Sequence, residues 1–172
     1  MIKLTVCLAV FLFAAMAQAE EMRVSIDGKE IRMDRTMLNR EITKDDRDKG
    51  NQTSALACSF SIYNLLAKGD IQGAAKLSVS PSKAAEKWTN YRERIGDEDF
   101  KKMMADYFSS GNVAIAELYL GDDTMLVVKT EDGPVAQFYQ KRGGKYLMTD
   151  EPTSGKILGR VLNMLREGRI RL

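Results

Sequence analysis

The sequence predicts an α+β fold in which helices are followed by a four-stranded antiparallel meander. Apolar residues recur every three or four positions between residues 53 and 111, which is typical of helices with one buried face. They recur at every second position between residues 112 and 149, which is typical of strands. Short turns join the strand runs, and such connections make neighbouring strands antiparallel.

The first 19 residues have the pattern of a cleaved secretory signal. Lys3 precedes an apolar run from Leu4 to Ala15, and the residues Ala17-Gln18-Ala19 match a cleavage site. The run is shorter than the roughly 20 residues that a membrane-spanning helix needs. We expect cleavage after Ala19 and a periplasmic or secreted chain of 153 of the 172 residues.

Residues 20–52 are expected to hold a hairpin and a charged loop. The hairpin is predicted at residues 22–34, where apolar and polar residues alternate around the turn formers Asp27 and Gly28. Residues 35–52 are rich in charge and have little apolar spacing, so we expect a loop or a frayed helix there.

The helical part divides at residues that suit helix ends. Gly69 permits the left-handed backbone that ends a helix, and Asp70 can accept hydrogen bonds from the first amides of the next one. Pro81 suits the first position of a further helix, where its missing N–H has no cost. We expect four helices, at residues 53–68, 71–77, 81–95 and from 97 to near 111.

The meander is followed by a basic amphipathic helix. The four strands are expected at residues 113–120, 124–130, 134–140 and 145–149. Residues 155–166 place five branched aliphatic side chains on one face and basic or polar groups on the other. This helix either docks on the core of its own domain or contacts an acidic partner protein or an anionic membrane surface.

The corner Leu65-Leu66-Ala67-Lys68-Gly69-Asp70 and the order of elements around it resemble the α/β cone of the cystatin-like and nuclear-transport-factor-two-like families. Those families wrap a bent antiparallel sheet around a long helix. The resemblance covers residues 53–149 and implies a cone-like domain, whose mouth the N-terminal hairpin or the C-terminal helix can cover. We therefore divide the chain into a signal (1–19), a hairpin and charged loop (20–52), a cone-like domain (53–154) and a C-terminal helix (155–172).

The two sides of the predicted sheet differ in chemistry. Strict alternation gives one purely apolar side, which we expect to pack on the helices: Ala114, Ala116, Leu118 and Leu120 in the first strand. The other side mixes aliphatic, aromatic and polar groups, as in a pocket wall, a dimer interface or a solvent face. This candidate ligand or partner face comprises Val113, Ile115, Glu117, Tyr119, Gln137 and Tyr139.

Composition excludes several kinds of chemistry. The chain has no histidine, which excludes histidine-based triads and metal sites. Only Cys58 stays after signal cleavage, so no internal disulfide forms; we expect a buried, inert thiol, with a reactive thiol or an intermolecular bridge as alternatives. Asp45, Asp46 and Asp48 precede Gly50, but their spacing does not fit a calcium loop. We expect no metal and no cofactor.

An acid–base enzyme is the catalytic alternative. Glu117 is the acidic residue within a strand core, and Tyr119 or Tyr139 could supply a phenol beside it. The simpler interpretation is a solvent-facing Glu117 paired with Lys129 on the next strand.

Charge indicates a contact at the C-terminal end of the chain. Residues 141–172 carry eight basic and three acidic residues on an otherwise slightly acidic body, and no nucleic-acid motif is present. The candidate contacts to a partner protein, or weakly to a membrane, are Lys156, Arg160, Arg166, Arg169 and Arg171.

The sequence thus predicts a non-enzymatic binding or interaction module of the bacterial envelope, acting on an envelope protein or as a homodimer through the sheet face. A cone-pocket enzyme and a membrane-surface accessory protein are the alternatives.

Overall fold

The computed structural model describes residues 19–109 and 111–172, so the predicted signal lies almost entirely outside the described residues. One antiparallel sheet of six strands runs in chain order. The strands are β1 (Glu20–Ile26), β2 (Lys29–Glu41), β3 (Val113–Leu120), β4 (Asp123–Thr130), β5 (Gly133–Arg142) and β6 (Lys145–Met148).

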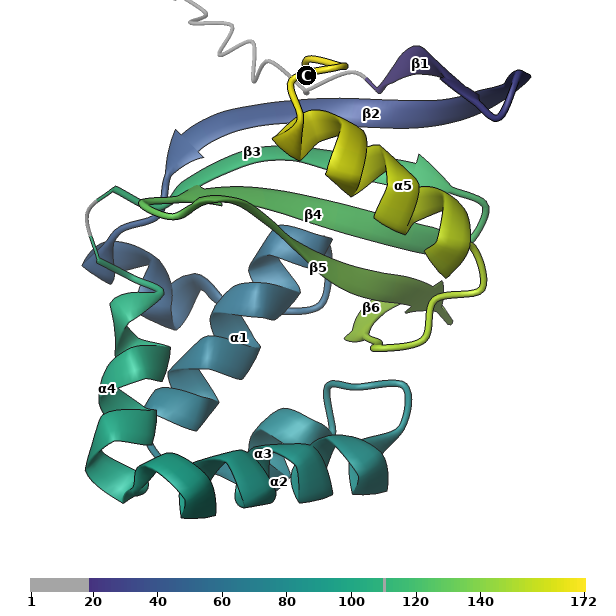
Figure 1. Ribbon diagram of the computed structural model, residues 1–172. Coiled ribbons are helices and arrows are strands. Elements are labelled where there is room, and N and C mark those ends of the chain that lie inside the picture. Colours follow the sequence, from purple (N-terminus) through teal and green to yellow (C-terminus); the bar gives the residue numbers. More distant parts are fainter. Residues whose placement is uncertain (1–18, 110) are drawn as a thin grey trace, which may run out of the picture.

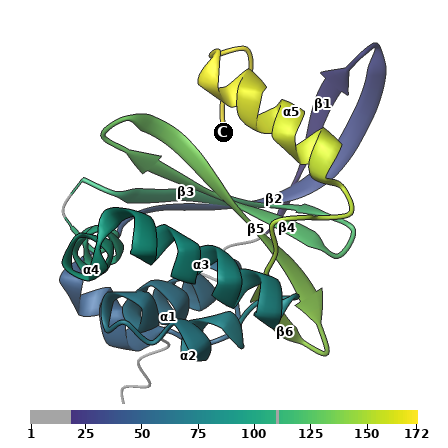
Figure 2. The same cartoon turned by 60° about the horizontal axis from the view of Figure 1, so that its bottom comes forward.

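Helices cover both faces of this sheet (Figure 1). One face carries a layer made of η1 (Lys44–Lys49), α1 (Ala55–Ala67), α2 (Ile71–Ala75), α3 (Pro81–Ile95) and α4 (Asp97–Asp106). The opposite face carries α5 (Gly155–Arg166), drawn in yellow, which lies across the strands (Figure 2). The α+β class is therefore confirmed, whereas the sheet has six strands rather than the four expected.

The two additional strands come from residues 20–41. The predicted hairpin forms, but β2 continues to Glu41 and pairs with β3 from Asp34 to Glu41. The prediction of a loop or frayed helix over residues 35–52 is wrong for this part. The segment is charged and lacks a regular apolar period, so its sequence does not indicate a strand. Hydrogen bonds to β3 and burial of a few apolar side chains stabilise the strand instead.

The central strand β4 is buried on both faces. Met125, Leu126, Val127 and Val128 each expose at most 2% of their surface. A strand with two covered faces carries a continuous apolar run instead of an alternating one. Successive side chains therefore enter two different cores, with Leu126 and Val128 facing the α1–α4 layer and Met125 and Val127 facing α5.

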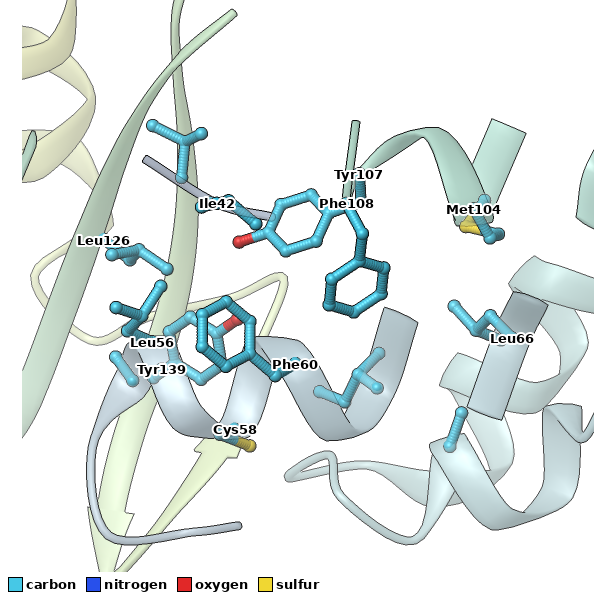
Figure 3. Close-up of a cluster of buried hydrophobic side chains, with 14 of the residues drawn as sticks. Ile42, Leu56, Cys58, Phe60, Leu66, Met104, Tyr107, Phe108, Leu126 and Tyr139 are labelled. Carbon is cyan, nitrogen blue, oxygen red and sulfur yellow. The ribbon is translucent and has the colours of Figure 1, made fainter. Parts of the chain in front are cut away.

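The larger core lies between the sheet and the α1–α4 layer (Figure 3). Phe60 of α1 packs near Phe108, with ring centroids 6.0 Å apart. Ile42 and Leu126 approach from the sheet side, and Phe100 enters from α4. Aromatic side chains bury large apolar areas, so this cluster contributes much of the hydrophobic stabilisation.

The smaller core lies under α5 and contains the side of the meander that we predicted to be apolar. Ala116 and Leu118 are fully buried there against Leu158 and Val161 of the helix. Ala114 instead joins the larger core, because a β-bulge shifts the register between Ala114 and Ala116. The apolar side therefore packs on a helix, as expected, for Ala116 and Leu118, whereas the placement of Ala114 on the same side is wrong.

Polar contacts fix the position of α5. Asp123 accepts a hydrogen bond from the backbone N–H of Ser154, at the start of the helix, over 2.5 Å. Arg160 forms an ion pair with Asp27 in the β1–β2 turn, and Arg166 donates to the carbonyl of Pro134 over 3.0 Å. The C-terminal helix thus docks on the core of its own domain, which was one of the alternatives expected from the sequence.

Within the described residues no helix has both the length and the apolar character needed to cross a membrane.

We predict that Leu158→Ala lowers the free energy of unfolding by about 2–5 kcal/mol, because it leaves a cavity between α5 and the sheet. Equilibrium unfolding in urea measures the change. Asn163→Ala, on the exposed side of the same helix, is the matched control and should change stability by less than about 0.5 kcal/mol. Equal effects of the two substitutions would contradict a structural role for α5.

Candidate binding cleft

A cleft opens between the edge of β5, the helices α1 and α3, and the segment that follows β6. Its volume is about 530 Å³, within the range of ligand sites in proteins. Its chemistry is mixed, with aromatic, hydroxyl, amide and charged groups. The lining residues that matter below are Tyr63, Lys83, Lys87, Trp88, Ala136, Gln137, Phe138, Arg142, Thr149, Asp150 and Glu151.

The floor of the cleft is a hydrogen-bonded group of side chains. Gln137 donates to the hydroxyl of Tyr63 over 3.3 Å and accepts from the hydroxyl of Tyr139 over 2.7 Å. The ring of Tyr63 stacks on Tyr107 with centroids 3.9 Å apart. Burial raises the pKa of Tyr63 to about 12, so this phenol stays neutral and acts as a hydrogen-bonding group rather than as a base.

Two ion pairs cross the rim of the cleft. Lys87 lies 2.8 Å from Asp150, and Lys83 lies 3.6 Å from Glu151. All four side chains are more than half exposed, and such pairs contribute only about 0–1 kcal/mol each. They join α3 to the segment after β6 through contacts that a ligand can replace. Trp88, the single tryptophan of the chain, lines the cleft from the same helix.

The wall formed by β5 contains an open stretch of strand edge. The neighbouring strand β6 pairs only with residues 139–142 of β5. The carbonyl of Phe138 still accepts from the N–H of Thr149 over 2.8 Å, after which the chain turns away toward α5. Pro134 has no N–H, and its carbonyl is bonded to Arg166. The main-chain groups of Ala136 and the N–H of Phe138 lie between these two points.

The outer edge of β6, by contrast, is closed. Tyr146 donates its N–H to the carbonyl of Gln52 over 3.0 Å and accepts from the side chain of Gln52 over 3.2 Å. Met148 donates to Leu77 over 2.9 Å and accepts from Val79 over 2.8 Å. The segments before α1 and after α2 therefore satisfy this edge, which separates it physically from the open stretch of β5.

Glu117 lies outside the cleft lining, beneath α1. It exposes 3% of its surface, and one carboxylate oxygen accepts from the N–H of Leu56 over 2.8 Å. The other oxygen accepts from the hydroxyl of Tyr119 over 2.5 Å. Burial and then the hydrogen bond to Glu117 raise the pKa of Tyr119. The solvent-facing pairing of Glu117 with Lys129 is therefore wrong, and the carboxylate instead caps the first turn of α1.

The predicted partner face is divided. Glu117, Tyr119, Gln137 and Tyr139 lie on the side of the sheet toward α1, but Ile115 packs on the side of α5, because the bulge reverses the alternation. Val113 is the first residue of β3 and is partly exposed. Gln137 lines the cleft; Glu117 and Tyr139 are buried beneath α1.

The predicted C-terminal contact residues Lys156, Arg160, Arg166, Arg169 and Arg171 are all exposed. Three of them have partners within the chain, since Arg169 pairs with Glu167 over 2.6 Å and Arg160 and Arg166 hold α5 as described.

Asp46, which we considered as part of a calcium loop, is fully buried and accepts from the N–H of Thr43 over 3.0 Å. It also pairs with Arg40 and with Lys49, so it serves to fix η1. Among the described residues no group of three or more acidic or cysteine side chains is arranged to hold a metal ion.

Sequence reasoning did not find the cleft. One signal was available: Lys83 and Lys87 are four residues apart, and Trp88 follows, so α3 carries charged and aromatic groups on adjoining faces. The cleft itself depends on where β6 leaves β5, and spacing along the chain does not reveal that point.

No protein-family model, no curated protein and no solved structure matches this chain.

We predict that Glu117→Ala lowers the free energy of unfolding by about 2–4 kcal/mol, because the N–H of Leu56 and the hydroxyl of Tyr119 lose their buried acceptor. Glu117→Gln should cost less, since its amide oxygen can still accept from Leu56. Urea unfolding measures both variants. A loss below about 1 kcal/mol for Glu117→Ala would contradict the capping role.

Cys58 should be unreactive in the folded chain. Its thiol is buried and donates to the carbonyl of Tyr146 over 3.2 Å, and burial raises its pKa to about 12. At mildly alkaline pH we predict alkylation by iodoacetamide at least about a hundredfold slower in buffer than in denaturing urea, because the thiolate is the reactive form. Similar rates in the two solvents would contradict this prediction.

Proposed function

We propose that this chain is an exported, non-enzymatic binding module of the bacterial envelope, and that it binds a partner protein in the cleft between α3 and β5. The observation that carries the proposal is the open edge of β5 in the wall of a cleft of about 530 Å³. The exposed, weakly paired lysines at the rim and Trp88 on the same helix add groups suited to recognition.

The placement of the sheet supports a cleft rather than a sheet face as the binding surface. Both faces are covered by helices, so neither the homodimer nor the partner contact through an open face is proposed further. The cone-like arrangement of the cystatin-like and nuclear-transport-factor-two-like families stays part of the proposal, with α1 as the helix that the sheet wraps.

The arrangement of ionisable groups favours binding over acid–base catalysis. An enzyme of the kind considered above needs Glu117 in a pocket that a substrate can enter. Glu117 is instead used twice as an internal hydrogen-bond acceptor, and the tyrosine phenols nearby have raised pKa values. The membrane-surface alternative loses its apolar anchor, because α5 already buries its apolar face.

Site-specific photo-cross-linking in the producing organism tests the proposal. A benzophenone amino acid at Lys87, on the rim of the cleft, should give covalent adducts with a partner protein. The same residue at Lys102 of α4 is the matched control, because both lysines pair with an aspartate of the chain and expose 60% and 77% of their side chains. Equal adducts at the two positions, or none at Lys87, would contradict a binding function of the cleft.

A further inference from the structure

We infer that the cleft binds an extended, acidic segment of the partner protein as an added strand along the open edge of β5. The inference rests on the proposed function and specifies the form of the ligand. Strand addition of this kind derives its affinity from main-chain hydrogen bonds and its specificity from neighbouring side chains.

The main chain of β5 directs hydrogen-bonding groups toward the cleft beyond the point where β6 stops pairing. In an antiparallel sheet, successive residues direct their N–H and C=O groups to opposite sides of the strand. Phe138 directs its carbonyl outward to Thr149, so Ala136 directs both of its groups the same way. The side chains of Ala136 and Phe138 pack toward α5, which means that mainly their main chain borders the cleft. An extended peptide can satisfy three groups there: the N–H of Phe138 and both groups of Ala136.

Residues of the chain itself already contact both the edge of β5 and α3. Thr149 donates to Phe138 of β5, and the next two residues, Asp150 and Glu151, extend their carboxylates to Lys87 and Lys83 of α3. A short acidic segment, which bends at Asp150 and Glu151, therefore already bridges the edge of β5 and the lysines of α3 at one end of the open stretch. A peptide can continue the same pattern along Ala136.

The surface along α3 is mainly basic and so complements an acidic segment. A shallow hollow adjoins the cleft and shares Lys83 and Lys87 with it. Its charged residues are three basic groups and one acidic group: Lys83, Lys87, Arg94 and Glu86. Arg142 adds a further positive charge on the β5 side of the cleft. Because exposed ion pairs are weak, carboxylates of a ligand can replace Asp150 and Glu151 on the lysines.

The probe for this inference is a peptide selected from a phage-displayed library of random linear sequences on the full chain. We expect the enriched sequences to be rich in aspartate and glutamate and their binding to weaken with added salt. Amide hydrogen exchange, followed by NMR, then locates the contact. The exposed N–H of Ala136 should exchange at least about tenfold more slowly with peptide bound, whereas that of Gln137, which faces β4, should already be protected.

Two substitutions at one position separate main-chain from side-chain effects. Ala136→Pro removes the outward N–H without touching the β4 ladder, and proline is tolerated on such an edge. It should raise the Kd of the selected peptide at least about tenfold, while Ala136→Val, which keeps the N–H, should change it less than about threefold. Protection of the Gln137 amide in each variant verifies that the sheet is intact.

The outcomes distinguish the two proposals. Adducts at Lys87 combined with unchanged exchange of Ala136, or with equal affinities of the two variants, would overturn strand addition and leave the cleft as a binding site. Enriched peptides without acidic residues, an adduct consisting of a second copy of this chain, or no enrichment at all would likewise overturn the inference. If adducts at Lys87 are also missing, the proposed function fails with it.

Discussion

Burial of β4 on both faces is the constraint on which the other features depend. Its four central apolar residues enter two separate cores, so the middle of the sheet is shielded from solvent on both faces. A polar group without a hydrogen-bond partner strongly destabilises the fold in such surroundings. Each buried polar side chain therefore needs a hydrogen-bond donor or acceptor nearby. Glu117 with Leu56 and Tyr119, and Asp123 with Ser154 and Gln140, satisfy this requirement on opposite sides of the sheet.

These two carboxylates also fix where the helices attach. Glu117 holds the start of α1 against one face, and Asp123 holds the start of α5 against the other. Each accepts a backbone N–H in the first turn or at the cap, where free amides and the helix dipole favour a negative charge. Two acidic residues that an isolated strand would direct to solvent thus connect the sheet to both of its covering layers.

Local signals in the sequence were sufficient for most element boundaries. Asp70 accepts from the N–H of Gly73 over 2.8 Å, as expected of a cap, and Pro81 begins α3. The predictions that were wrong concern features that depend on how strands pair with one another. The bulge at Ile115 reverses which residues share a face, and β2 is stabilised by β3 rather than by its own apolar period. The cleft belongs to the same category, because it exists where one strand stops pairing with another.

Within the described residues helices cover both faces of the sheet, so contact with the sheet itself is possible at its strand edges, and these edges are not equivalent. Glu20, Glu21 and Arg23 line the outer strand β1, and charges of this kind discourage pairing with another chain. The edge of β6 is occupied by Gln52, Leu77 and Val79. On β5, the open stretch lies between Pro134 and the hydrogen bond that Phe138 accepts from Thr149. It is too short to pair with a long strand of another sheet, but a single peptide can pair with it. Interruption of the edge at both ends limits its pairing with another sheet, and the short stretch between the interruptions is the site that we propose for a partner peptide.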